Sequence, residues 1–194
     1  MTKEFLQEND IDTVAKQFDT ELTEYINQVN KIDDREVILE MEKQVIAEQD
    51  EVSEYLKNLK YELPNNVEFD GNKFTVKDIA NKIIYFLNKK EVEWKYTLGL
   101  YQLVKFWKQE NPTEILYGAY DSTLRLLNQV TFRGFHEWRN ILAVNEYLKS
   151  AHERYSKDTS WVLFCSEKHN ALMDRMKQLD QVQAEVTETT ETTE

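Results

Sequence analysis

The fold of this chain is decided first by residues 10–32, DIDTVAKQFDTELTEYINQVNKI. Apolar side chains recur in this stretch at alternating spacings of three and four residues, which places them along one side of a helix. The stretch has no Pro and no Gly, the residues that most often end a helix. We therefore predict a helix over residues 10–32 with a coiled-coil seam formed by Ala15, Phe18, Leu22, Tyr25, Val29 and Ile32.

A second amphipathic helix is predicted directly after the first. Asp33 followed by Glu36 has the form of a capping box, with Asp in the place usually taken by Ser or Thr. Glu48 stands at a core position of this helix, where an unpaired buried carboxylate would cost several kcal/mol. Either the seam faces solvent at this level or Glu48 has a basic partner. The seam residues are Ile38, Met41, Val45, Val52, Tyr55 and Leu59.

The rest of the chain predicts more helices and one β-hairpin. Two Pro and four Gly in 194 residues leave few breaks between helices. Apolar residues alternate on both sides of Asp70-Gly71, which predicts a small hairpin near residues 66–76. Thr75, three residues before Asp78, predicts the cap of the following helix. We expect a mainly α multi-helix bundle of about seven helices with an N-terminal helical hairpin.

The predicted helices after residue 90 differ in character. Residues 91–109 are apolar almost all round, which is typical of a buried central helix. Pro112 predicts the start of the next helix. A further helix follows Gly134, and Asp158 or Thr159 is expected to open the last one. The tail 181–194 is acidic and low in complexity, which predicts disorder.

Charge divides the chain into acidic, basic and acidic regions. Residues 1–72 hold 7 Lys or Arg against 19 Asp or Glu, residues 73–177 hold 17 against 12, and residues 178–194 hold none against 5. Such asymmetry bears on partners and on self-association, not on fold. We expect an acidic helical hairpin arm at 1–63, a helical core at 64–180 and the disordered tail at 181–194.

Catalytic and metal-binding motifs do not emerge from the sequence. His136 and His152 lack the second His four residues later that a zincin needs, and Cys165 and His169 alone give too few ligands for zinc. We expect no enzyme activity, no cofactor and no metal. Asn145 and His152 share a heptad line with Trp138 beside an apolar seam, which suggests either the edge of that seam or a polar pocket.

Two functions fit these observations. The first is a non-enzymatic assembly, scaffolding or accessory protein that binds protein partners or itself and suits a phage-type structural component. Its interaction residues would be six seam residues of the arm: Phe18, Leu22, Tyr25, Val45, Val52 and Tyr55. The alternative is single-stranded nucleic-acid binding by the basic aromatic module 73–177, since basic side chains can follow phosphates while rings stack on bases. The basic residues are Lys89, Lys90, Lys95, Lys105, Lys108 and Arg133.

The location of the protein is also an expectation from composition. No window approaches the ~18 apolar residues that a membrane span needs, and the N-terminal residues lack a basic region followed by an apolar run. A single cysteine suits a reducing compartment. We expect a cytoplasmic protein, or a virion-associated one if it is phage-encoded.

Overall fold

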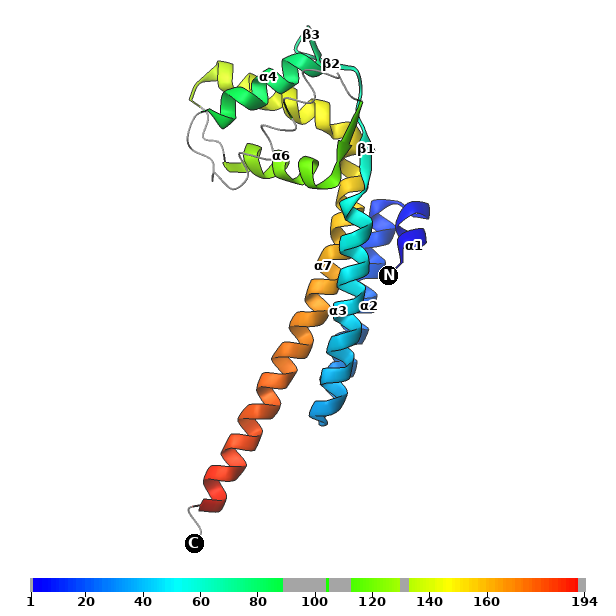
Figure 1. The fold of residues 1–194 in the computed structure, drawn as a ribbon, viewed down its shortest axis with the longest axis vertical. Coiled ribbons are helices and arrows are strands. Elements are labelled where there is room, and N and C mark those ends of the chain that lie inside the picture. Colours follow the sequence, from blue (N-terminus) through cyan, green and yellow to red (C-terminus); the bar gives the residue numbers. More distant parts are fainter. Residues whose placement is uncertain (1, 89–103, 105–112, 130–132, 192–194) are drawn as a thin grey trace. The chain divides into compact units, whose positions relative to one another are not determined.

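The computed structural model describes residues 2–88, 104, 113–129 and 133–191, with side chains through residue 184. The chain is mainly α-helical, as predicted, with small two-stranded β-ladders. It forms two compact units (Figure 1). Unit 1 consists of Met1–Tyr55 and Ser156–Glu194, and unit 2 of Leu56–Tyr155. This grouping differs from the expected division at residue 63, because the N-terminal helices have their packing partner in the C-terminal segment.

Unit 1 is a helix pair packed on the C-terminal part of a long helix. Helix α1 (Lys3–Glu8) leads into α2 (Ile11–Val29), and α3 (Arg35–Lys57) follows. Helices α2 and α3 pack beside α7 (Phe135–Glu191) (Figure 1). The sequence analysis did not predict α1. Burying the apolar stripes of three helices against one another is what stabilises such a bundle. The core cluster is Val29, Ile38, Val45, Leu172 and Met176.

The start of α3 differs by one residue from the prediction. Asp34, not Asp33, accepts the capping hydrogen bond, from the backbone N–H of Glu36 at 2.9 Å. The Asp33 carboxylate instead pairs with the Arg175 guanidinium on α7 at 2.6 Å. Two consecutive aspartates therefore have different partners: Asp34 caps the helix, and Asp33 pairs with a distant segment.

The predicted β-hairpin is confirmed in unit 2. Strands β2 (Asn66–Phe69) and β3 (Asn72–Thr75) pair antiparallel around Asp70 and Gly71. Both turn residues have positive φ, 51° and 71°, which is the combination that a type I′ turn needs. Thr75 then caps α4 (Val76–Leu87) in a reciprocal capping box with Asp78, also as predicted.

The prediction of a helix from Pro112 onward is wrong for its first residues. Glu114–Leu116 form strand β4, which pairs antiparallel with β1 (Lys60–Glu62), and α6 (Tyr117–Gln129) begins only afterwards. Ile115 is 1% exposed between two exposed neighbours, the alternation of a strand with one buried face. Pairing with a strand far away in the sequence overrides the local helix signal here.

The two helices expected after residue 134 are one. Helix α7 runs unbroken from Phe135 to Glu191. Asp158 does not cap a helix but lies inside it, with its side chain buried. No Pro or Gly interrupts residues 135–191, so polar residues near the expected break do not end the helix. The helical backbone also includes residues 181–191 of the tail where we expected disorder.

Some predictions fall largely outside the described residues. They are the buried helix over 91–109, of which Val104 alone is described and is buried, and the helix start at Pro112. Within the described ranges, no helix combines the length and apolar character that crossing a membrane requires.

Candidate functional site in unit 1

A groove of about 510 Å³ opens on the surface of unit 1. All of its walls belong to this unit: the start of α1, one side of α2, one side of α3 and the part of α7 beneath them. We call it the acidic groove, because five of its twelve lining residues are glutamates. The lining residues are Thr2, Lys3, Glu4, Glu21, Glu24, Tyr25, Gln28, Glu48, Glu51, Trp161, Phe164 and Lys168.

The acidic walls follow from helix periodicity. Glu21, Glu24 and Gln28 are three and four residues apart on α2, so they occupy one face. Glu48 and Glu51 are related in the same way on α3. Two helices thus each turn an acidic face toward the groove, while their apolar faces meet the core of unit 1.

An ion pair lies on the floor of the groove. Lys168 Nζ of α7 donates to Glu48 Oε2 at 2.5 Å, and the lysine side chain is 11% exposed against 45% for the glutamate. The same ammonium lies 4.9 Å from the ring centroid of Tyr25 and 5.4 Å from that of Phe164. A cation above aromatic faces is stabilised by the ring quadrupole. Glu48 thus has the basic partner that one alternative required, and its 45% exposed side chain also reaches solvent, as the other alternative required.

Tyr25 contributes a buried hydroxyl to this floor. Its oxygen is inaccessible to solvent and has no hydrogen-bond partner among the described residues. Burial, and then the nearby charge of Glu48, raise the pKa of Tyr25 to about 12. The phenol is therefore neutral at physiological pH, and an unsatisfied hydroxyl of this kind costs about 1–3 kcal/mol.

Glu21 keeps its negative charge despite partial burial. Burial by itself would raise its pKa, but a hydrogen bond from the Gln17 side-chain amide, 2.6 Å from Glu21 Oε1, and the charge of Lys168 contribute to a net lowering. A lowered carboxyl pKa means that the group is ionised at neutral pH. The α2 wall of the groove is therefore negatively charged in solution.

At the α1 end, aromatic and polar contacts hold the helices together. Tyr55 Oη donates to the buried Asp158 carboxylate at 3.2 Å, and its ring packs at 5.6 Å from that of Trp161. The Lys3 ammonium lies 5.0 Å from the Tyr55 ring centroid. These contacts position α1 at the end of the groove.

Comparisons with known proteins do not assign a function to this chain. No family model, curated protein or solved structure matches this chain. Its function therefore has to be argued from its own residues.

The six seam residues proposed for interaction come together inside unit 1. Val45 and Val52 are both 2% exposed, so they are covered by this chain itself. The Phe18 ring meets that of Phe164 edge-on at 5.6 Å. Tyr25 and Tyr55 make the contacts given above, and Leu22 is half-buried. An interaction role for these residues stays a prediction, but their position in the structure is that of a core facing α7. The acidic groove beside them was not predicted, although the spacing of Glu48 and Glu51 carried part of the signal.

Of the six basic residues proposed for nucleic-acid contact, Arg133 is described, and Lys89, Lys90, Lys95, Lys105 and Lys108 lie outside the described residues. Arg133 is exposed just before α7, and its backbone N–H donates to Glu137 Oε2 at 2.5 Å. Nearby, Phe135 is 67% and Trp138 40% exposed, with their ring centroids 5.6 Å apart. The sequence analysis named Trp138 but did not predict this exposed aromatic pair.

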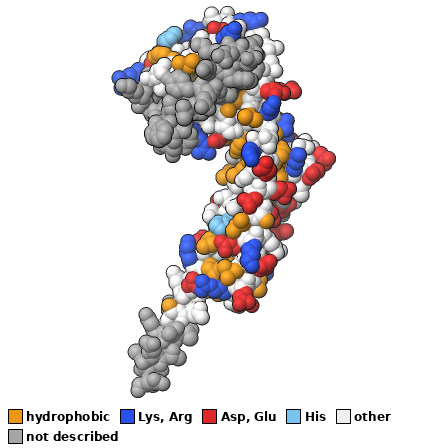
Figure 2. Space-filling model, in the orientation of Figure 1, with side chains coloured by type: hydrophobic (Ala, Val, Ile, Leu, Met, Phe, Trp, Pro, Cys, Tyr) orange, Lys and Arg blue, Asp and Glu red, His pale blue; other side chains and the backbone are white. Residues whose placement is uncertain are grey.

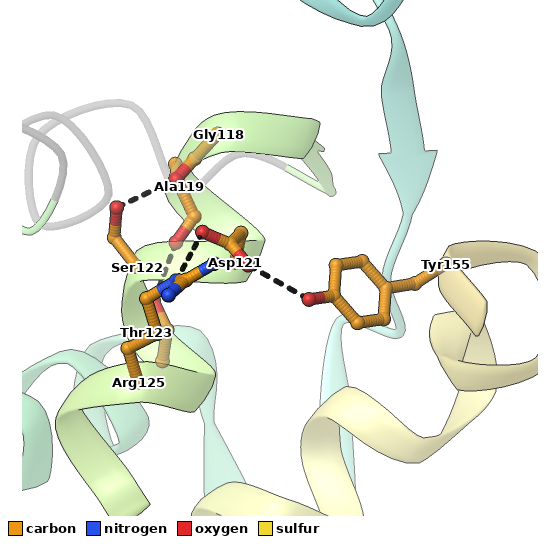
Figure 3. Close-up of polar contacts among 7 residues, drawn as sticks. All are labelled: Gly118, Ala119, Asp121, Ser122, Thr123, Arg125 and Tyr155. Atoms are coloured by element: carbon orange, nitrogen blue, oxygen red, sulfur yellow. Dashed lines mark hydrogen bonds and ion pairs between the residues drawn. The ribbon is translucent and has the colours of Figure 1, made fainter. Parts of the chain in front are cut away.

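Asn145 and His152 do line a common hollow in unit 2. It measures about 360 Å³, and both residues are exposed on the first part of α7. The His152 ring stacks on that of Tyr155 at 6.2 Å. Tyr155 Oη donates to Asp121 at 2.8 Å, and Asp121 also accepts from Arg125 at 2.7 Å (Figure 3). This network ties α6 to α7, so its role is to hold the helices of unit 2 together.

Cys165 and His169 are not arranged as metal ligands. Burial, with Glu48 nearby, raises the pKa of the Cys165 thiol, which makes it a poor ligand and nucleophile at neutral pH. His169 Nε2 lies 3.2 Å from Glu42 Oε1 on α3. Among the residues that the structure describes, no three His, Cys, Asp or Glu side chains converge as a metal site would require.

Proposed function

We propose that this chain is a non-enzymatic helical assembly, scaffolding or accessory protein that works through protein–protein contacts. The observation that carries the proposal is a pair of exposed apolar side chains on the outer face of α3. Leu39 and Ile46 are 41% and 44% exposed. Since they are seven residues apart, they share one face of the helix, away from the buried Val45 and Val52. Aligned apolar side chains on an otherwise charged helix are typical of a surface that a second helix covers.

The charge of unit 1 determines how such contacts depend on salt. Its two segments hold 9 Lys or Arg against 24 Asp or Glu, a net charge of −15. Acidic side chains are visible along unit 1 in Figure 2. Two copies of unit 1 repel one another at low salt, so contacts through Leu39 and Ile46 should strengthen as salt screens that repulsion. The size and acidity of the chain suit a phage-type structural component.

The test is light scattering coupled to size-exclusion chromatography at low and moderate salt, with absorbance read at 260 nm. The proposal expects a defined oligomer free of nucleic acid that Leu39→Ser with Ile46→Ser disrupts. Leu116→Ser is the matched control, because Leu116 of unit 2 is 44% exposed. A monomer that carries nucleic acid, released by salt, would overturn the proposal in favour of the alternative.

The alternative is single-stranded nucleic-acid binding by the module 73–177. The exposed pair Phe135 and Trp138 favours it, since the Arg139 guanidinium lies 5.9 Å from the Phe135 ring centroid, and rings beside a basic group can stack on bases. Fluorescence anisotropy with a labelled single-stranded oligonucleotide tests this function. Phe135→Ala with Trp138→Ala should then weaken binding by roughly 1–3 kcal/mol for each base that loses its stacking partner.

A further inference from the structure

The acidic groove has more negative charge than its own lysines neutralise. Lys168 is held by Glu48, and Lys3 lies above the ring of Tyr55. Glu24 and Glu51, on opposite walls, have no hydrogen bond or ion pair with any described residue. The groove thus offers two exposed carboxylates on facing helices, above an aromatic floor.

The floor of the groove holds a cationic side chain of the chain itself. The Lys168 ammonium is already bound there by one carboxylate and two aromatic rings. Beside it, the buried Tyr25 hydroxyl has no partner among the described residues. Trp161 and Phe164 also line the groove, and at 6% and 5% exposure most of each ring is covered by the chain itself. Carboxylates and aromatic rings are the groups that commonly bind Lys and Arg side chains in proteins.

We propose that the acidic groove docks a basic segment of a protein partner, with a Lys or Arg side chain of that segment entering between Glu24 and Glu51. This inference rests on the proposed function and names the chemistry of the partner. A volume of about 510 Å³ accommodates such a side chain together with part of its backbone. The net charge of −15 on unit 1 steers a basic segment toward it.

Other occupants fit the groove less well. A divalent cation needs converging ligands, and no three of the described side chains form such a set. A second copy of the chain would have to supply the basic segment. In the described part of unit 2, three of its cations are already paired, as Lys60 with Glu114, Arg125 with Asp121 and Arg139 with Asp70. We therefore take a different, basic protein as the occupant of the groove.

The experiment uses the full chain and a fluorescein-labelled decapeptide of alternating Lys and Ala, with a Gln and Ala decapeptide as the neutral control. Anisotropy titrations compare the native chain with Glu24→Gln/Glu51→Gln. The matched control variant is Asp19→Asn/Glu167→Gln, which changes the net charge of unit 1 equally at exposed positions outside the groove lining. All these substitutions replace exposed side chains, and circular dichroism verifies that the variants are folded.

The proposal expects the Lys peptide to bind and the Gln peptide not to bind. The groove variant should weaken binding by roughly fivefold or more, and the control variant by less than about twofold. If the two variants lost peptide affinity equally, binding would depend on the overall negative charge of unit 1 and not on the groove, and the proposal would be overturned. Spermidine binding as tightly as the peptide, with the same dependence on Glu24 and Glu51, would overturn the protein partner in favour of a small polyamine. Absence of Lys-peptide binding would also overturn the proposal.

Light scattering on the same variants separates this inference from the proposed function. If the groove does not bind the Lys peptide, but the chain still forms a nucleic-acid-free oligomer that Leu39→Ser with Ile46→Ser disrupts, only the inference about the groove is wrong. If the chain forms no such oligomer and nucleic acid co-purifies with it, the proposed function is wrong as well.

Discussion

Removing either member of the ion pair between Lys168 and Glu48 should lower the stability of the chain by a different amount. The two atoms are 2.5 Å apart, but the lysine side chain is 11% exposed and the glutamate 45%. At an effective dielectric constant of about 20, two charges at this distance attract by roughly 6–7 kcal/mol, and the desolvation of a buried ion, several kcal/mol, offsets most of this. Removing the exposed partner therefore leaves a covered ammonium, whereas removing the covered partner leaves a carboxylate that water can reach.

Glu48→Gln should accordingly lower the free energy of unfolding by about 2–4 kcal/mol, since the Lys168 ammonium loses its carboxylate while it stays covered. Lys168→Met should cost about 1 kcal/mol or less, because Glu48 is rehydrated and Met packs on the rings that the ammonium leaves. The double variant should resemble Lys168→Met, with a coupling energy of at least about 1 kcal/mol.

The assay is urea unfolding followed by circular dichroism at 222 nm. Val45→Ala identifies the transition of unit 1, because Val45 is buried in its core. Lys177→Met is the surface control, since its pair with Asp174 has both side chains 69% exposed and should contribute less than about 0.5 kcal/mol. The reasoning is refuted if Lys168→Met costs more than Glu48→Gln, or if the two single effects simply add.

Three further outcomes are expected. Asp78→Ala should lower the free energy of unfolding by about 1 kcal/mol, because it removes one half of the capping box that Asp78 forms with the cap residue Thr75. Hydrogen bonds from Thr75 lower the Asp78 pKa, so this contribution is present above pH 3.8 and is lost as pH falls through the folded-state pKa. Acid unfolding of the native and variant chains will reveal it. Gly71→Ala should destabilise the chain by about 1 kcal/mol because φ is +71° there, whereas Gly118→Ala, in helix α6 with open space around it, should stabilise it by about 0.5–1 kcal/mol in the same urea assay. Burial raises the pKa of Tyr120 to about 12, so it should ionise above the exposed tyrosines in a 295 nm titration, and its contribution to stability should be intact below pH 10 and lost between pH 10 and 12. The pKa values of Tyr25 and Tyr147 are also raised to about 12, so Tyr120→Phe should reduce the amplitude of the high-pH component without abolishing it; an unchanged amplitude would count against the assignment.

The features that the sequence predicted well are those set by neighbouring residues. The Asp70-Gly71 turn and the Thr75 cap are confirmed because a turn or a cap needs no more than a few adjacent side chains. The conflict at Glu48 was also visible, since a charge at a seam position demands a partner. The identity of that partner was not, because Lys168 lies 120 residues away in the sequence.

The features that were missed depend on distant segments. Strand β4 exists because residues 60–62 offer it a partner, which outweighs the local signal at Pro112. Asp158 looked like a helix cap by residue type, yet packing against Tyr55 accommodates its carboxylate inside α7. The acidic groove likewise needs α2, α3 and α7 together, so no single spacing could reveal it. The predicted function remains to be tested by the experiments above.

Unit 1 is built from two pieces of chain with all of unit 2 between them, and this order has a consequence for synthesis on the ribosome. The hundred residues of unit 2 are complete before residues 156–194 emerge. During that interval α2 and α3 have no α7 segment to cover Ile38 and Val45, and their net negative charge disfavours contacts between two such hairpins. The final segment therefore acts as the closing step of folding, so that a chain truncated before residue 156 would lose the fold of its own N-terminus.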